Sequence, residues 1–465
     1  MSGGNLGKIV VASHVRDNHL DPRRMRTIIL LLATSVALMM TGFGIIMPVF
    51  ARRLAELGAG VEALGIMTTA FALTQLAAAP FLGSLADRYG RRPFVLLALV
   101  AFIFTNVGYL LAGSVPAFIA VRALGGLFTA GLFPAAMGVV ADVSPEAQRA
   151  RWIGVIMGGY GAGFVFGPVL GGVLYDNFGF AAPFTTSAGM GVLALLAAAL
   201  LVTETRPPQV RRREALRQRW VAERNGGGEE TAVSVWDALP RPLAVFSTLL
   251  FLDFIGSFAF AFVEPQMVFY LYDQLNWTTA QFGIVVGVYG MAMMLGQLFL
   301  GQASDRFGRK PVIVLGQALN LMLYVNLAFV HSYALVMAGS FIAGLGAALT
   351  APAISAFYLD MTARQHRSRV IGIKEASLSL GGVLGPLLVV VATRYTSAQG
   401  VFLIAGALML FSVLLALLVL RSPRQRLATD GEMGRLHDAQ RSQAAEVILR
   451  GLVLQAARAR GIERG

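Results

Sequence analysis

The chain has 465 residues, of which 56% are hydrophobic and 14% charged, and its formal net charge is +13. This apolar content exceeds what one soluble core buries, and the arginines lie in short clusters between apolar runs, so the composition argues against a soluble protein and against nucleic acid as a partner. The sequence contains no cysteine, which excludes disulfides, thiolate metal ligands and a cysteine nucleophile.

The chain begins with a polar segment, residues 1–26, that lacks a short apolar core ending in a small-residue cleavage site. We therefore expect no removable signal peptide. An apolar run of about 20 residues crosses a bilayer as an α-helix. Twelve such runs follow, at residues 27–50, 62–84, 93–113, 115–140, 151–175, 180–203, 241–271, 279–301, 311–331, 333–358, 369–393 and 398–421.

Basic residues gather in alternate joints between these runs. The joints contain Arg88, Arg91 and Arg92; Arg149 and Arg151; Arg306, Arg309 and Lys310; and Arg364, Arg367 and Arg369. By the positive-inside rule, these joints and both termini face the cytoplasm. Arg52, Arg53 and Arg394 fall on the other side and are too few to reverse the topology. We expect a multi-pass protein of the cell (inner or plasma) membrane, monomeric in the lipid bilayer.

Two polar segments interrupt or follow the apolar pattern. Residues 204–240 carry "RPPQVRRREALRQRW" and then "NGGGEE", which is typical of a cytoplasmic linker, with room for a short basic helix on anionic headgroups. Residues 422–465 form a cytoplasmic tail, in which 444–460 fit an amphipathic helix. This helix lies on the membrane surface in the favoured interpretation and binds a regulator or partner in the other.

The chain repeats itself at a fixed offset. Asp305 follows Asp87 by 218 positions, and the same offset relates Asp142 to Asp360 and Gly167-Pro168 to Gly385-Pro386. The sequence therefore predicts an all-α polytopic membrane protein of two pseudo-symmetric six-helix bundles, residues 27–203 and 241–421. Such duplicated bundles place a substrate site near the midplane at their interface and work by rocking.

The loop "GSLADRYGRRPF" and its copy "GQASDRFGRKPV" join the second and third spans of each half. We expect glycines to allow tight turns and the aspartates to pair with arginine. Our hypothesis is that Asp87 and Asp305 join arginine-linked latches, with Arg149 or Arg151 and their counterparts Arg367 or Arg369, that close the cytoplasmic gate in the outward-open state. The expected gate residues are Gly83, Asp87, Arg88, Gly90, Arg91, Arg92, Asp142, Asp305, Arg306, Gly308, Arg309 and Asp360.

These residues resemble the major facilitator superfamily across about 27–421. The first loop matches the superfamily pattern G-x-L-A-D-R-x-G-R-R/K, and "GFVFGPVLGG" is similar to the fifth-span signature of proton-coupled exporters. The matching residues of that antiporter motif are Gly163, Gly167, Pro168, Gly171 and Gly172. Glycines four apart let neighbouring helices touch, so the motif could serve packing alone. The resemblance implies instead that this helix contact seals the outer side and favours export over leak.

The fourth span carries "RALGGLFTAG", which resembles a third exporter signature through Arg122 and Gly126. The usual glutamine of that signature is replaced by Gly125. An arginine in a span costs about 2.5–3.5 kcal/mol on insertion scales, so it faces water or a partner, or else snorkels to the interface. The second half has Ser340 at the corresponding position, so this arginine belongs to the first half alone.

The seventh span carries two carboxylates, Asp253 and Glu264, which are spaced to share one helix face at about 16 Å apart. Glu264 followed by "FYLYD" and "NWTT" resembles the seventh span of quinolone and multidrug exporters, which implies proton and substrate binding by Glu264. Those exporters also have a tenth-span aspartate, whereas 333–358 contains no acidic residue, leaving Asp253 as the second candidate. Each carboxylate also has an alternative interpretation without a role in coupling. Asp253 would pair with a neighbouring polar group, and Glu264 would lie at the outer mouth of the transporter.

Further residues are candidates for the substrate cavity or for packing. The aromatic and methionine residues Phe43, Met47, Phe260, Tyr289 and Met293 are candidates to line an adaptable pocket, although many such residues face lipid. Lys374 and Glu375 form either a buried pair or, as we favour, an interfacial one. We find no nucleotide loop, metal cluster or catalytic triad in the sequence, so we expect no cofactor, no bound metal and no enzyme activity.

The sequence thus favours a proton-coupled exporter of amphipathic, cationic or zwitterionic small molecules that works by alternating access. Proton and substrate would compete for the same carboxylates, which is what antiport requires. One alternative is a dedicated exporter of a metabolite, sugar or lipid on the same fold. The other is a transporter-like sensor or scaffold that acts through its linker and tail.

Overall fold

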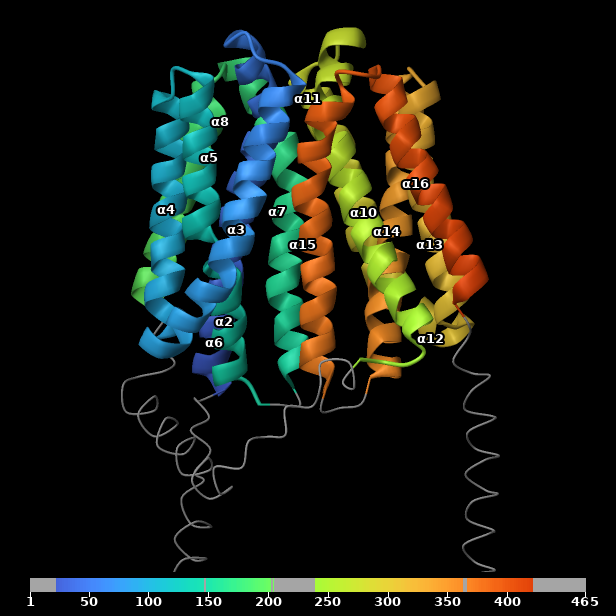
Figure 1. Cartoon of the computed structure of the whole chain (residues 1–465). Coiled ribbons are helices and arrows are strands. Elements are labelled where there is room, and N and C mark those ends of the chain that lie inside the picture. Colours follow the sequence, from blue (N-terminus) through green and yellow to red (C-terminus); the bar gives the residue numbers. More distant parts are fainter. Residues whose placement is uncertain (1–21, 146–147, 202–203, 205–238, 363–365, 421–465) are drawn as a thin grey trace, which may run out of the picture.

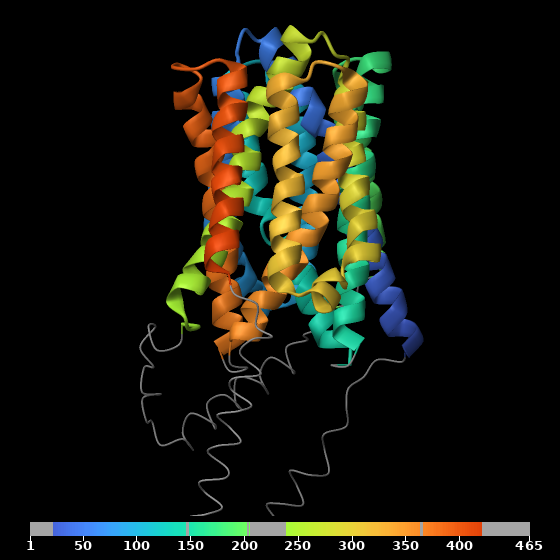
Figure 2. The same ribbon diagram turned by 90° about the vertical axis from the view of Figure 1, so that its right-hand side faces the viewer.

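The computed structural model describes residues 22–145, 148–201, 204, 239–362 and 366–420, and every element in these ranges is helical. Figures 1 and 2 show long helices that run roughly along one common axis. The expectations for the N-terminal segment before Pro22, for most of the linker and for the tail fall outside the described residues.

The first half of the described chain contains seven helices, α2 (Pro22–Glu56), α3 (Val61–Tyr89), α4 (Arg91–Leu111), α5 (Val115–Thr129), α6 (Leu132–Val143), α7 (Arg149–Phe178) and α8 (Ala181–Leu201). The second half contains α10 (Leu243–Phe269) with a π-helical end (Tyr270–Gln274), α11 (Thr279–Leu300), α12 (Ala303–Phe307), α13 (Arg309–Phe329), α14 (Tyr333–Met361), α15 (Arg367–Ala392) and α16 (Ala398–Val419). Twelve spans in the described ranges are long and apolar enough to cross a membrane, which confirms the expected number.

The fourth span departs from the prediction of one continuous helix. It is broken between Thr129 and Leu132, whereas its counterpart α14 continues past Pro352. Pro134 removes a backbone donor and crowds the carbonyl four residues earlier. The first half has Gly131 three residues before this proline and the second half has Leu349 at the corresponding position, so the weaker helix former accompanies the break.

The helices of the bundle end at two opposite faces. The linker end contains residues 90, 144, 204, 239, 308 and 420, and the distal end contains the turns at 57–60, 112–114, 178–180, 275–278 and 393–397. At the linker end, Gly90 (φ +111°) and Gly308 (φ +92°) form the sharp joints before α4 and α13. These φ values disfavour residues with a side chain, so each loop glycine has a backbone role.

The contacts at the linker end are repeated between the halves. Arg91 pairs with Asp87 and Asp142, and Arg309 pairs with Asp305 and Asp360. Arg92 donates to the Ala199 carbonyl at 2.6 Å, and Lys310 donates to the Leu417 carbonyl at 2.7 Å. All these pairs obey the offset of 218, so the repeat preserves interactions as well as residue types.

Glycines also let helices within each half approach closely. A Cβ on Gly163 would overlap Met40 and Thr41 of α2, and one on Gly171 would overlap the backbone of Ile45. In the second half, Gly381 and Gly385 meet the backbone of α10 near Phe258 in the same way. The α7–α2 and α15–α10 pairs are therefore equivalent packing units, as small residues at a helix interface predict.

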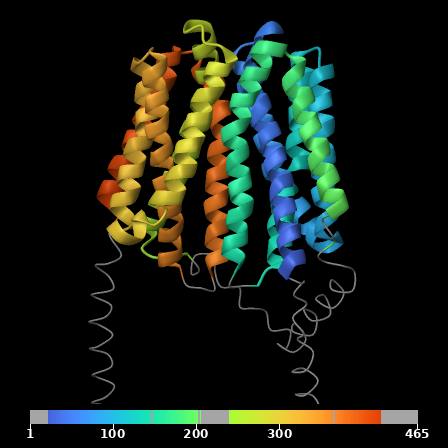
Figure 3. The ribbon, with the colours of Figure 1, turned by 180° about the vertical axis from the view of Figure 1, so that it is seen from behind.

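The two halves meet along two related crossings. Gly283 of α11 lies against the Pro168 carbonyl of α7, and Gly65 of α3 lies against the Pro386 carbonyl of α15. Figure 3 shows α7 in green beside α11 in yellow. Each contact joins a glycine of one half to a proline inside a helix of the other half. The prolines of the fifth and eleventh spans therefore lie at the interface between the halves.

Candidate functional site

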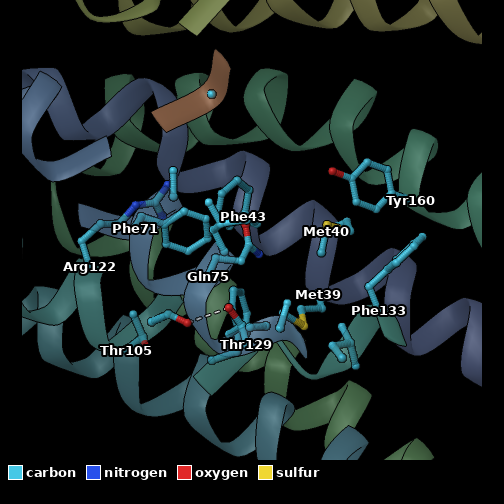
Figure 4. A pocket seen from close by; sticks show the side chains of 18 of the residues that line it. Met39, Met40, Phe43, Phe71, Gln75, Thr105, Arg122, Thr129, Phe133 and Tyr160 are labelled. Carbon is cyan, nitrogen blue, oxygen red and sulfur yellow. Dashed lines mark hydrogen bonds between the residues drawn. The ribbon is translucent and has the colours of Figure 1, made fainter. Parts of the chain in front are cut away.

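A cavity of about 660 Å³ lies mainly in the first half, lined by α2, α3, α4, α5, α6 and α7, and α10 and α15 of the second half complete its wall. Figure 4 shows Arg122, Phe71 and Phe43 close together, and Tyr160 and Phe133 in another part of the cavity. In the described lining the charged residues are Arg122 and Glu375. A mostly apolar cavity of this size with few polar groups suits a drug-sized ligand.

Arg122 is buried in the wall of this cavity, with 9% of its surface exposed. Its guanidinium carbon lies 4.1 Å from the centre of the Phe71 ring, 4.8 Å from that of Phe43 and 4.9 Å from that of Phe50. The negative faces of aromatic rings attract a cation. The snorkelling alternative for Arg122 therefore does not describe the structure, since the side chain is enclosed by aromatic rings.

Glu264 brings a negative charge from the other half toward Arg122. The half-buried Glu264 on α10 interacts electrostatically with Arg122 on α5, as does the Tyr109 hydroxyl on α4. Arg122 Nε is buried without a hydrogen-bond partner in the described structure. The attraction between Glu264 and Arg122 therefore acts between the two halves. The Arg122 Nε–H is available to another hydrogen-bond acceptor.

Asp253 lies in a second charged cluster nearer the linker end. It has 7% of its surface exposed and interacts electrostatically with Lys374 and Glu375 of α15 and with the Tyr358 hydroxyl of α14. Asp253 Oδ2 and the Tyr358 hydroxyl are buried, and neither makes a hydrogen bond of standard geometry in the described structure. The shared helix face predicted for Asp253 and Glu264 therefore serves two separate sites.

Lys374 and Glu375 are paired, with Lys374 Nζ 3.1 Å from Glu375 Oε1. The Lys374 side chain is only 13% exposed, and Glu375 lines the cavity. The Glu375 side chain is 62% exposed, so the pair has one buried and one open member. The choice between a buried and an interfacial pair therefore stays a prediction.

The distal end is closed by contacts between the halves. Tyr272 donates to the Pro48 carbonyl at 2.7 Å, and Arg52 donates to the Trp277 carbonyl at 2.6 Å. Asp176 of α7 accepts hydrogen bonds from the first amides of α11, those of Thr279 and Ala280, at 3.2 and 2.7 Å. A carboxylate at a helix N-terminus is favourable. Arg52 thus has a structural use, which explains one exception to the charge rule.

The expected gate residues cluster at the linker end. The structure places Arg91 beside Asp87 and Arg309 beside Asp305, four residues along the same chain segment. Arg367 donates to the Leu359 carbonyl at 3.4 Å, and Arg151 lies over the Trp152 ring. Arginines of the loop motif itself thus take part in these clusters. The latch with Arg149 or Arg151 and Arg367 or Arg369, expected when the linker end is closed, stays a prediction.

The antiporter motif lies at helix crossings. Gly163, Gly167 and Gly171 face α2, whereas Gly172 faces the backbone of Thr279 and Ala280 across the interface. The second half has Val389 and Val390 at the last two positions, and these valines meet Gly65 of α3. The asymmetry that we noted between the copies thus falls where α7 and α15 contact the opposite half.

One of the five proposed cavity residues lines the cavity, namely Phe43. Phe260 and Tyr289 stack on each other, with ring centres 6.2 Å apart, and they, like Met47 and Met293, are not in the described lining. Sequence reasoning missed other lining residues, including Met39, Met40, Phe71, Gln75, Phe133 and Tyr160. Phe71 and Gln75 are four apart on α3, a spacing that puts them on one face.

The family model of the Major Facilitator Superfamily matches residues 32–272 and 246–459, and the chain belongs to that superfamily. The chain is 24% identical over 363 residues to the quinolone resistance protein NorA of Staphylococcus aureus, covering 77% of this chain and 88% of that protein. It is 28% identical over 396 residues to the class C tetracycline resistance protein of Escherichia coli, covering 82% and 93%.

Solved structures share the fold. The human organic anion transporter MFSD10 (TETRAN) superimposes with a TM-score of 0.61 at 21% identity, and the match covers 85% of this chain and 100% of that one. A bacterial homologue of the human lysosomal transporter Spinster, inward-facing and occupied, gives a TM-score of 0.65 at 15% identity, covering 86% and 97%. The chain is a multi-pass membrane transporter and not an enzyme.

Proposed function

We propose that this protein is a proton-coupled exporter of amphipathic cationic or zwitterionic small molecules. The observation that carries the proposal is Arg122, a buried cation in the cavity wall of one half, whose charge acts on Glu264 of the other half. A proton on Glu264 removes the charge that attracts Arg122 across the interface. The protonation state of Glu264 is thereby linked to the interaction between the two halves that must rock.

The cavity supports this substrate class. Its aromatic lining offers flat surfaces for a lipophilic molecule, and Glu375 supplies a negative charge for a cationic group. Arg122 supplies the complementary site for an anionic group of a zwitterion. Related sequences named for quinolone and tetracycline resistance also support export of small molecules.

In the proposed orientation the protein lies in the cell membrane with its linker end facing the cytoplasm, as the basic joints predict. The distal contacts of Tyr272 and Arg52 then close the outer side, and the arrangement is one in which substrate enters from the cytoplasm. The clusters around Arg91 and Arg309 form the gate that closes the linker end in the other state. The transporter works as a monomer.

The proposal is tested with purified protein in liposomes that carry an imposed pH gradient. We expect wild type to move a cationic dye uphill against its concentration gradient. Glu264→Gln should lose uphill movement and keep downhill exchange, because the cavity remains while the proton site is gone. Glu62→Gln is the matched control, since Glu62 is an exposed carboxylate at the distal end, and it should behave as wild type.

Two outcomes would contradict the proposal. Uphill dye transport by Glu264→Gln would remove Glu264 from proton coupling. Indifference of wild type to cationic dyes, together with saturable transport of one metabolite, sugar or lipid, would replace the multidrug substrate class by a dedicated one.

A further inference from the structure

The second charged cluster, formed by Asp253, Tyr358, Lys374 and Glu375, is not required by the Arg122–Glu264 pair. Ser377 donates to the Leu250 carbonyl at 2.8 Å, which fixes α15 against α10 one turn from both Lys374 and Asp253. Figure 1 shows these two helices side by side. Neighbouring residues on a helix point about 100° apart, so Lys374 can face α10 while Glu375 faces the cavity.

The repeat shows that the fold does not need these charges. At the offset of 218, the first half has Ser35 in place of Asp253 and Val140 in place of Tyr358, while Ile156 and Met157 replace Lys374 and Glu375. Ser35, Val140 and Ile156 are all 0% exposed, so the first half packs the same positions without a charge. Since buried charges are costly in a membrane span, their presence in one copy indicates a function.

Lys374 interacts with two carboxylates that differ in their surroundings. It forms an ion pair with Glu375, whose side chain is 62% exposed and lines the cavity, and its charge also acts on the buried Asp253. Asp253 Oδ2 has no hydrogen-bond partner in the described structure. With one ammonium for two carboxylates, the group carries a net negative charge when all three are ionised, so it has a place for one more cation.

We propose that Lys374 is an exchangeable counter-ion that pairs with Asp253 when that carboxylate is charged and with Glu375 when Asp253 is protonated. Glu375 is then free to bind the cationic group of a substrate only in the first state. This inference rests on the proposed proton-coupled transport, and it assigns a cation subsite to Glu375 and a second proton site to Asp253.

The exchange is balanced in charge. A proton from the cytoplasmic or outer solution binds an Asp253 oxygen and neutralises it. Lys374 Nζ then pairs with Glu375 Oε1, as in the structure, and the substrate cation leaves. Loss of the proton returns Lys374 to Asp253 and frees Glu375. The facing ionisable groups are Lys374 and Glu375 of α15 and Tyr358 of α14, so no further charge among the described neighbours enters the exchange.

The test is the affinity of the purified full chain in detergent for tetraphenylphosphonium, measured by calorimetry at pH 6 and pH 8. Wild type should bind about tenfold more tightly at pH 8, within the usual range of a coupling between sites. Asp253→Asn should bind weakly at both pH values, because Lys374 stays on Glu375. Lys374→Met should bind tightly at both, because Glu375 stays free.

Controls separate a switch from a structural role. Lys374→Arg should keep the pH dependence, Glu375→Gln should bind weakly at both pH values, and Glu62→Gln should match wild type. Equal effects of Asp253→Asn and Lys374→Met, or an unchanged pH dependence in either, would overturn the inference. Failure of wild type to bind the probe would also overturn it, whereas the proposed transport function stands or falls separately on uphill movement in liposomes.

Discussion

Arg122 shows how one side chain can connect two halves of a transporter. Its guanidinium is held among three phenylalanine rings of its own half, and its charge attracts Glu264 of the other half. A rigid aromatic cage reduces the ways in which the arginine can move. A change in the charge of Glu264 therefore acts on the contact between the halves and leaves the cage intact.

Substitution of Arg122 should separate these two contributions. Arg122→Met removes the positive charge that acts on Glu264 from the other half. We expect uphill dye transport in liposomes to fall by about tenfold, within the usual range of a coupling between sites. Arg122→Lys keeps the charge and should retain part of the activity.

Arg394→Met is the control for this substitution, since Arg394 is an exposed arginine at the distal end. If Arg122→Met drove uphill transport at the rate of wild type, the interaction between Arg122 and Glu264 would have no part in coupling.

At the scale of elements, the fifth span is built to approach its neighbours. Gly163, Gly167 and Gly171 meet α2, and Pro168 meets α11 through Gly283. The same arrangement recurs in α15 with α10 and α3. These contacts are made by backbone atoms, so they hold the helices at distances that side chains would prevent.

Gly171→Ala should therefore destabilise the protein. A Cβ at this position would overlap the Ile45 carbonyl, and overpacking of this kind costs about 1–3 kcal/mol. We expect a lower Tm for thermal unfolding in detergent. Gly161→Ala on the same helix is the matched control, because its Cβ would enter open space, and alanine favours a helix. A Tm for Gly171→Ala equal to that of the control would show that the seam tolerates separation.

The sequence predicted the elements well because the bilayer imposes a strong length and hydrophobicity requirement on each span. The offset of 218 predicted two matched bundles, and the mirrored Arg91 and Arg309 clusters confirm that fold. The break in the fourth span was missed, since Pro352 in the equivalent helix does not break it. Local sequence alone did not separate these two prolines.

Less of the candidate site could be predicted. Glu264, Asp253 and Arg122 stood out because a charge in an apolar span is unusual, and their positions needed no contact information. The cage around Arg122 and the place of Glu375 in the cavity depend on which helices become neighbours. Aromatic residues are common in every span, so most of the proposed lining residues could not be told from packing residues.

At the scale of the whole molecule, repeated residues and unrepeated residues have different roles. The repeated contacts at the linker end and along the glycine seams give both halves the same frame. The unrepeated charges lie between the frames: Arg122 comes from the first half, and Glu264, Asp253, Lys374 and Glu375 come from the second. The repeated contacts thus build a structure that can rock, and the unrepeated charges supply the proposed proton and substrate sites.

The central claim is that proton binding at Glu264 and Asp253 opposes the binding of a cationic substrate, and proton release on substrate binding tests it most directly. Purified protein in weakly buffered detergent solution at pH 6 is titrated with tetraphenylphosphonium while a pH indicator is followed. We predict that binding to wild type releases protons, that Glu264→Gln and Asp253→Asn each release fewer, and that Glu62→Gln matches wild type. Binding of the cation to wild type without any release of protons would contradict the claim.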